Sequence, residues 1–179
     1  MLIEANFFHH SRAQGPNFTS VRNSTIFVVH NLIVVQANNR QAIGFTDSST
    51  GNQFKNNVIV ALSISGTTVS ANANGQLLAT DTSTAQANTF EHNAWLSGSF
   101  GSDDSAPAYT PNSTELRLTN FDVSWFAAFP TTVGHDSVVF APTATAPWLS
   151  QGNLLPEVPA DRAGKVRRAP VTLGPYELP

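Results

Sequence analysis

Four residues in the middle of the chain have side chains that could carry acid–base chemistry: Glu91, His92, Asp103 and Asp104. A histidine beside a carboxylate can move a proton near neutral pH, and carboxylate oxygens are ligands that calcium prefers. Trp95 follows closely and could offer a flat ring for stacking on a sugar. These five residues form the candidate site for catalysis on a carbohydrate or for its binding.

Each of these residues also has a structural interpretation, which we favour. Asp103 and Asp104 lie among Gly and Ser, where carboxylates are typically solvated turn residues. His92 precedes an Asn at an expected chain bend, and Trp95 can belong to the core or to an interface. The sequence has no H-E-x-x-H, no dense carboxylate cluster and no Gly-x-Ser-x-Gly. We therefore expect no metal site and no cofactor, and calcium binding has no supporting motif.

The composition is that of strands and turns. Charged residues are 12% of the 179 residues, whereas the chain has 16 Asn, 18 Thr and 17 Ser. Neutral polar side chains can be buried in rows when they pair with one another, and the Lys and Glu of solvated helices are scarce, which excludes a helical bundle. The absence of cysteine excludes disulfides and thiolate metal sites. A net charge of −3 disfavours nucleic acid as a partner, and no apolar run is long enough for a membrane span.

A local pattern, Asn-x-Phe-x-x-Asn followed by an apolar run, occurs at residues 52–57 and 88–93. Weaker copies precede these two. We take one aromatic residue in each copy as equivalent, with spacings of 19, 27 and 36 residues: Phe8, Phe27, Phe54 and Phe90. A fixed element at variable spacing is typical of a solenoid whose loops differ in length.

We therefore predict an all-β fold, a parallel β-helix, in which the Phe side chains stack inside. Asn tolerates the left-handed backbone of a sharp bend, and its amide can pair with the next coil, so Asn57 and Asn93 should form a ladder. The expected bends are the polar pairs at residues 9–10, 30–31, 56–57 and 92–93. An antiparallel sandwich is the alternative, but Asn74-Gly75 is the only Asn-Gly hairpin signal in the sequence.

The expected organisation is a single continuous domain. Residues 1–98 should form the β-helix coils, and residues 99–179 the last coils, a loop and an irregular capping region rich in Pro and aromatic residues. We expect large side chains of this region, Trp125 and Trp148 among them, to close the open end of the solenoid.

The C-terminal sequence contains Ala-Pro-Trp-Leu at 146–149, Asp-Arg-Ala-Gly at 161–164, Arg-Arg at 167–168 and Leu-Gly-Pro-Tyr-Glu at 173–177. This ending resembles that of right-handed parallel β-helix repeat proteins, particularly the bacterial surface group called choice-of-anchor Q domain proteins. It departs from their pattern by Ala-Pro in place of Ser-Pro and by the form of its last element. The resemblance implies a right-handed β-helix, a fold that hosts polysaccharide lyases, hydrolases, adhesins and structural modules alike.

The charged residues of this ending also have a direct physical interpretation. We expect Asp161, Arg162, Arg167 and Arg168 to form a clasp that locks a returning strand by bidentate pairs, with Gly164 in the turn. A basic patch for an acidic glycan is the alternative.

Two functions follow as hypotheses. The first is a non-catalytic extracellular or cell-surface module, structural, adhesive or glycan-contacting, which belongs to a longer chain or an assembly. Because the chain begins in an apparent strand, we expect an upstream β-helix segment or another subunit to cover its N-terminal end. The second is a polysaccharide lyase or glycoside hydrolase of the β-helix type, with Glu91, His92, Asp103 and Asp104 as its candidates. No secretion signal is visible in the sequence.

Overall fold

The fold is taken from a computed structural model of the chain. It describes residues 1–4, 7–10, 17–19, 26–35, 41–46, 50–65, 68–79, 87–101, 109–127 and 141–178, with the backbone alone for residues 7–10, 17–19, 41, 46, 64, 65, 68 and 79. Within these residues the regular structure is β, apart from one turn of 3₁₀ helix, η1 (Val123–Trp125). The prediction of an all-β fold is confirmed.

Thirteen of the fourteen described strands form three parallel sheets, which we call A, B and C. Sheet A contains β1 (Leu2–Glu4), β4 (Phe27–Val29), β7 (Gln53–Lys55) and β11 (Thr89–Glu91). Sheet B contains β2 (Phe7–His10), β5 (Leu32–Val35), β8 (Val58–Ser65), β12 (Ala94–Leu96) and β14 (Leu116–Leu118). Sheet C contains β3 (Asn17–Thr19), β6 (Gln41–Thr46), β10 (Gln76–Ala79) and β13 (Ser99–Gly101). The remaining strand, β9 (Thr68–Ala71), pairs antiparallel with β8.

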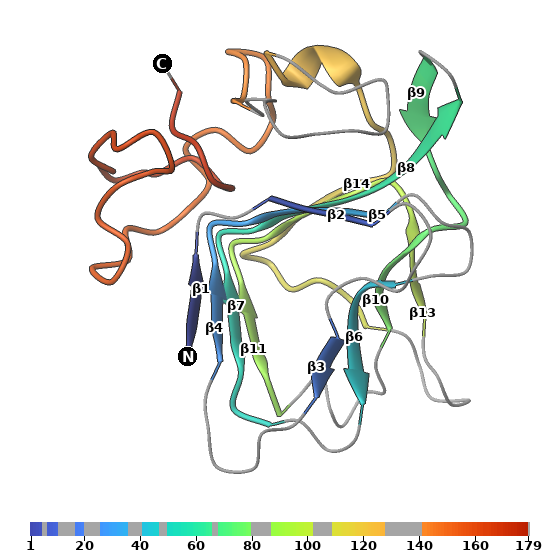
Figure 1. The fold of residues 1–179 in the computed structure, drawn as a ribbon, viewed down its shortest axis with the longest axis horizontal. Coiled ribbons are helices and arrows are strands. Elements are labelled where there is room, and N and C mark those ends of the chain that lie inside the picture. Colours follow the sequence, from blue (N-terminus) through green and yellow to red (C-terminus); the bar gives the residue numbers. More distant parts are fainter. Residues whose placement is uncertain are drawn as a thin grey trace.

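From β1 to β13 the chain visits sheets A, B and C in this order, so that each passage forms one layer, and β14 adds one more strand to sheet B. Figure 1 shows sheet A on the left, sheet B along the top and sheet C on the lower right. Strands of successive layers pair in register; Val28 lies beside Phe54, and Phe54 beside Phe90. Among the described strands, the only antiparallel ladder is that of β8 and β9, which contradicts the antiparallel sandwich.

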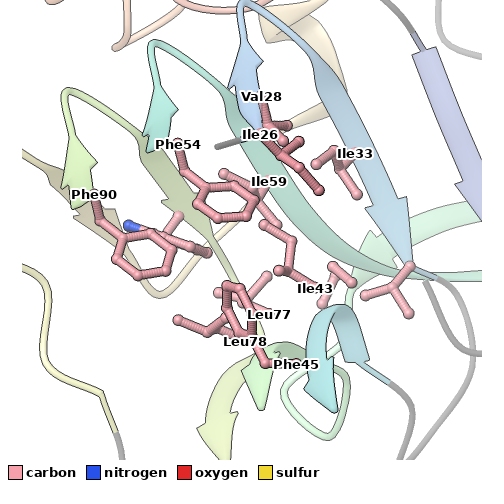
Figure 2. Packing of buried hydrophobic residues seen from close by; sticks show 14 residues of the cluster. Ile26, Val28, Ile33, Ile43, Phe45, Phe54, Ile59, Leu77, Leu78 and Phe90 are labelled. Atoms are coloured by element: carbon pink, nitrogen blue, oxygen red, sulfur yellow. The ribbon is translucent and has the colours of Figure 1, made fainter. Parts of the chain in front are cut away.

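One apolar cluster fills the space between the three sheets. Sheet A contributes Phe54 and Phe90, whose rings stack 5.0 Å apart, and sheet C contributes Phe45, which meets both rings edge-on. Figure 2 shows these rings beside aliphatic side chains from the other strands. Burial of such side chains is the main driving force of folding, at about 25 cal/mol per Å² of apolar surface.

The assignment of two aromatic residues to this stack is wrong. Phe27 pairs with Gln53 and is only half-buried, because the register places Val28 beside Phe54. Phe8 lies in β2 of sheet B, beside Ile33, and not in sheet A with the other two. At Phe27 a shift of one residue turns the side chain to the opposite face, whereas Phe8 belongs to the next strand of its layer, so the spacing of aromatic residues alone misplaced both positions.

The second apolar cluster lies on the outer face of sheet B. Alternate residues of β5 and β8, such as Leu32, Val34 and Val60, point away from the first cluster and are also buried. They are covered by residues from the C-terminal third of the chain, including Phe126 and Trp148. A strand buried on both faces reads as a continuous apolar run, as in Leu-Ile-Val-Val of β5.

Trp125 and Trp148 therefore do not close the end of the layers, which we expected of them. Trp148 packs on Trp125 and Phe126 against the flank of sheet B, and the orange and red trace of Figure 1 runs outside the sheets. This arrangement has a physical reason: the outer side chains of sheet B are apolar and need a cover.

No described helix has the length and apolar character needed to cross a membrane.

Candidate functional site

The bends between sheets A and B carry a row of polar residues. His30, Asn56 and His92 occupy equivalent positions in successive layers, with left-handed φ angles of 55°, 58° and 52°. Asn and His both adopt this conformation more readily than most other residues. The pair His9-His10, which we expected at a bend, instead lies within strand β2.

The next residue of each bend forms a ladder of side-chain amides. Asn31 donates its backbone N–H to Oδ1 of Asn57 at 2.9 Å and its Nδ2 to the same oxygen at 3.1 Å. Asn57 repeats both contacts with Asn93, at 3.1 and 3.0 Å. All three side chains are buried, and Asn57 and Asn93 also donate to strand carbonyls. The ladder thus pairs polar groups of the bends across three layers.

Glu115 occupies the ladder position in the last layer. Leu116 pairs with Ala94 and donates its N–H to the carbonyl of Asn93, as Ala94 does to Asn57. The Glu115 carboxylate accepts from Asn93 Nδ2 at 3.1 Å and from the indole of Trp95 at 2.8 Å. A carboxylate only accepts, so it ends a series in which the amides of Asn57 and Asn93 both accept and donate.

Tyr109 also donates its hydroxyl to Glu115. Burial of the phenol, together with the nearby carboxylate, raises the pKa of Tyr109 well above its ordinary value. A phenol in this state keeps its proton at neutral pH, so Tyr109 is a hydrogen-bond donor and not a base.

Arg117 closes the same end of sheet B. Its guanidinium donates to the carbonyls of Trp95, Ser97, Leu118 and Gly98 at 2.5–3.0 Å, and it lies 5.3 Å from the ring centre of Phe100. Desolvation lowers the pKa of Arg117 from its ordinary value. Its two terminal nitrogens thus connect β14 with β12 and with the turn that follows β12. Neither Glu115 nor Arg117 was a candidate in the sequence analysis.

Glu91 and His92 lie next to each other, and both are held by structural partners. Glu91 forms a salt bridge of 3.0 Å with Lys55, which stands beside it in sheet A. The His92 Nδ1 lies 2.9 Å from the Gln151 carbonyl, and its Nε2 lies 2.8 Å from Asn153 Nδ2. Because a carbonyl only accepts, Nδ1 carries the proton and Nε2 accepts from Asn153. Both ring nitrogens of His92 are thus engaged by the C-terminal segment.

The other three candidates do not complete a site around this pair. Trp95 has no exposed surface and packs against Phe90 and Phe100. A buried ring cannot stack on a sugar, so the interpretation of Trp95 as a sugar platform is wrong, and the residue belongs to the core. Asp103 and Asp104 lie outside the described residues. Within the described part of the chain, no group of three His, Asp or Glu side chains is arranged to hold a metal ion.

The charged residues of the C-terminal segment are divided between a buried and an exposed set. Arg167 is buried and pairs with Glu177 at 2.5 Å. Asp161 accepts the N–H groups of Ala163 and Lys165 across the turn at Gly164, whose φ is +82°, and also that of Glu177. These contacts differ from the clasp that we expected: Glu177 is the partner of Arg167, and Arg162 and Arg168 are exposed.

Beside this clasp lies an open groove of about 420 Å³. Two exposed cations, Lys165 and Arg168, line it together with Ser150, Val166, Pro170, Thr172, Glu177 and Leu178. Glu177 adds little net charge, because its carboxylate is paired with Arg167 and also accepts the Thr172 N–H. The groove is therefore a small polar depression with an excess of positive charge.

No protein-family model matches this chain, and no curated protein is significantly similar to it in sequence.

The hydrogen-bond and ion-pair partners of the charged residues decide which of them can meet a ligand. The acid–base candidates Glu91 and His92 stabilise the layers and the C-terminal segment, whereas Lys165 and Arg168 are accessible from solvent.

One signal could have revealed Glu115: it precedes the apolar run of β14 as Asn57 and Asn93 precede those of β8 and β12.

Proposed function

We propose that the chain is a right-handed parallel β-helix module with a structural, adhesive or glycan-contacting role, and that it does not catalyse a reaction. The three parallel sheets, visited in the order A, B, C by successive layers, support the β-helix part of this proposal. The aromatic stack and the amide ladder are the interactions that such a stack of layers needs.

One observation carries the non-catalytic part: the strongest acid–base candidate is used as a structural group. His92 has both ring nitrogens bound by Gln151 and Asn153 of the C-terminal segment, and the neighbouring Glu91 is paired with Lys55. A general base must reach a substrate proton directly or through one water. His92 can do so only if the C-terminal segment leaves its position on the bends.

We further propose an extracellular or cell-surface location and a larger assembly. The resemblance of the C-terminal ending to choice-of-anchor Q domain proteins supports the location. The assembly is supported by the strands of the first layer, because β1, β2 and β3 each form the edge of their sheet. Edge strands present backbone groups that can pair with further strands, which an upstream segment or a second subunit would supply.

The proposed function is tested by incubating the chain with uronate-containing polysaccharides, with and without calcium. Ultraviolet absorbance would reveal the unsaturated sugars that a lyase releases, and reducing-end assays would reveal hydrolysis. We expect no product in either assay. Turnover that is lost in His92→Ala or Asp104→Ala would overturn the proposal in favour of a β-helix polysaccharide lyase or glycoside hydrolase.

Light scattering coupled to size exclusion tests the assembly. We expect a discrete oligomer or filament of the chain, formed through the edge strands of the first layer. A stable monomer at high concentration would contradict self-association of the isolated chain.

A further inference from the structure

The groove beside the C-terminal clasp has no role in the interactions that hold the layers together. Its lining residues come from residues 150–178, which lie outside the three sheets (Figure 1). Its volume of about 420 Å³ lies within the range of roughly 300–1,000 Å³ that is usual for small-ligand sites. The charges and hydroxyls of this groove identify the kind of ligand that fits it.

Among the described residues, no acidic side chain neutralises the two exposed cations of the groove. Arg168 is exposed and forms no ion pair with any residue that the structure describes, and Lys165 donates only to the carbonyl of Leu178. The single carboxylate of the lining, Glu177, is held by Arg167 on the buried side. Two cations at one small depression suit an oxyanion, which Arg can bind through two parallel hydrogen bonds and Lys through a point charge.

The remaining lining residues suit a ligand that is larger than a free anion. Ser150 and Thr172 carry hydroxyls that can donate and accept, as sugar hydroxyls do. Val166 and Pro170 add an apolar wall, and Val166 is 64% exposed. Most sugar rings have such an apolar face beside their polar edge.

We propose that this groove binds an acidic sugar residue, with Lys165 and Arg168 on its oxyanion and with Ser150 and Thr172 near its hydroxyls. The oxyanion is the carboxylate of a uronic acid or the sulfate ester of a sulfated sugar. The inference rests on the glycan-contacting part of the proposed function and names the class of glycan. With a net charge of −3, the chain has no general attraction for polyanions, so binding depends on this local pair of cations.

Calorimetric titration of the full chain tests the proposal with four probes. These are an oligouronate, the same oligosaccharide with its carboxylates reduced to alcohols, a sulfated oligosaccharide, and inorganic sulfate. We expect one of the two acidic oligosaccharides to bind, at least tenfold more tightly than the reduced one, and to weaken as salt is added. The acidic probe that binds more tightly identifies the oxyanion.

Three variants locate the site. We expect Arg168→Ala and Lys165→Ala each to weaken the binding of the acidic oligosaccharide by tenfold or more. Arg162→Ala, which removes an exposed cation outside the groove, should leave it unchanged. Circular dichroism and the thermal unfolding midpoint of each variant establish that it is folded.

Three results would overturn the inference. They are equal binding of the acidic and reduced oligosaccharides, unchanged binding in both Arg168→Ala and Lys165→Ala, and binding of inorganic sulfate as tight as that of the sulfated oligosaccharide. The last would identify an anion site without sugar recognition. None of these results produces turnover, so failure of the inference is distinguishable from a catalytic activity that would refute the proposed function.

Discussion

Replacement of Asn57 by Ala tests the amide ladder at its centre. The Asn57 side chain accepts the backbone N–H and Nδ2 of Asn31, at 2.9 and 3.1 Å, and donates to the Val28 carbonyl at 2.7 Å and to Asn93 Oδ1 at 3.0 Å. The residue has no exposed surface, so no water from the surface replaces these contacts directly. The variant therefore removes four hydrogen bonds from the interior.

The expected magnitude follows from the partners that remain. Asn31 Nδ2 still donates to the carbonyls of Ile3 and Val29, and Asn93 Oδ1 still accepts the backbone N–H of residue 57. The Asn31 backbone N–H loses its side-chain acceptor, and such an orphaned buried donor costs about 1–3 kcal/mol. With the net loss of the other bonds and the small cavity, we expect Asn57→Ala to lower the free energy of unfolding by about 2–4 kcal/mol.

Urea unfolding followed by circular dichroism measures this change, with Asn120→Ala as the matched control. Asn120 is exposed, and its replacement should shift the free energy of unfolding by less than about 0.5 kcal/mol. The two variants should have the same dependence of stability on urea, so the shift in midpoint reports stability. Equal stabilities of Asn57→Ala and Asn120→Ala would refute the account of the ladder.

Three further perturbations test other parts of the structure. At Gly98 the angle φ is +61°, and an added Cβ would lie 2.5 Å from a backbone oxygen. Gly98→Ala should therefore destabilise the fold by clearly more than Gly164→Ala, whose Cβ would meet nothing within 4 Å and whose expected cost is the roughly 1–2 kcal/mol of left-handed strain. Equal urea midpoints of the two variants would contradict this expectation. Burial lowers the pKa of His30 to about 3, so below the ordinary value of 6.5 the unfolded chain binds a proton that the folded chain does not. The free energy of unfolding should therefore fall by up to about 1.4 kcal/mol per pH unit as the pH is lowered from 6.5 to 3. In unfolding curves recorded across this range, His30→Asn, in which Asn tolerates the bend, should lose this part of the pH dependence. Glu177→Ala leaves the buried Arg167 without its carboxylate and should lower the free energy of unfolding in urea by about 3–5 kcal/mol. The double variant Glu177→Ala with Arg167→Met should lose less stability than the single variant. A double variant less stable than the single one would contradict a buried ion pair.

The bends were predictable because their backbone conformation restricts the residue type. Asn56 and His92 adopt left-handed φ angles, and each is followed by an Asn whose amide reaches the next layer. The chemistry of Asn thus signals both the turn and the ladder from sequence alone. Parallel pairing followed from the same pattern, since equivalent bends must lie above one another.

The register of the second layer was not predictable from its aromatic residue. Phe27 and Val28 are both apolar, and only the alignment of Asn31 with Asn57, 26 residues apart, places Val28 beside Phe54. Glu115 pairs with Asn93 and Trp95, which lie 22 and 20 positions away; its place before the apolar run of β14 is a local sign of its ladder position but not of these two partners. The cover on sheet B was also not predictable, because an apolar residue is expected to be buried but its type does not say against which face of a sheet.

The central claim is that the residues able to perform acid–base chemistry hold this chain together. It is tested most directly at His92, by the ¹⁵N chemical shifts of its imidazole in the full chain. We predict a single tautomer with the proton on Nδ1, which donates to the Gln151 carbonyl, while Nε2 accepts from Asn153. A proton on Nε2, or shifts averaged between the two tautomers as in a solvated imidazole, would contradict the claim and leave His92 free to act as a base.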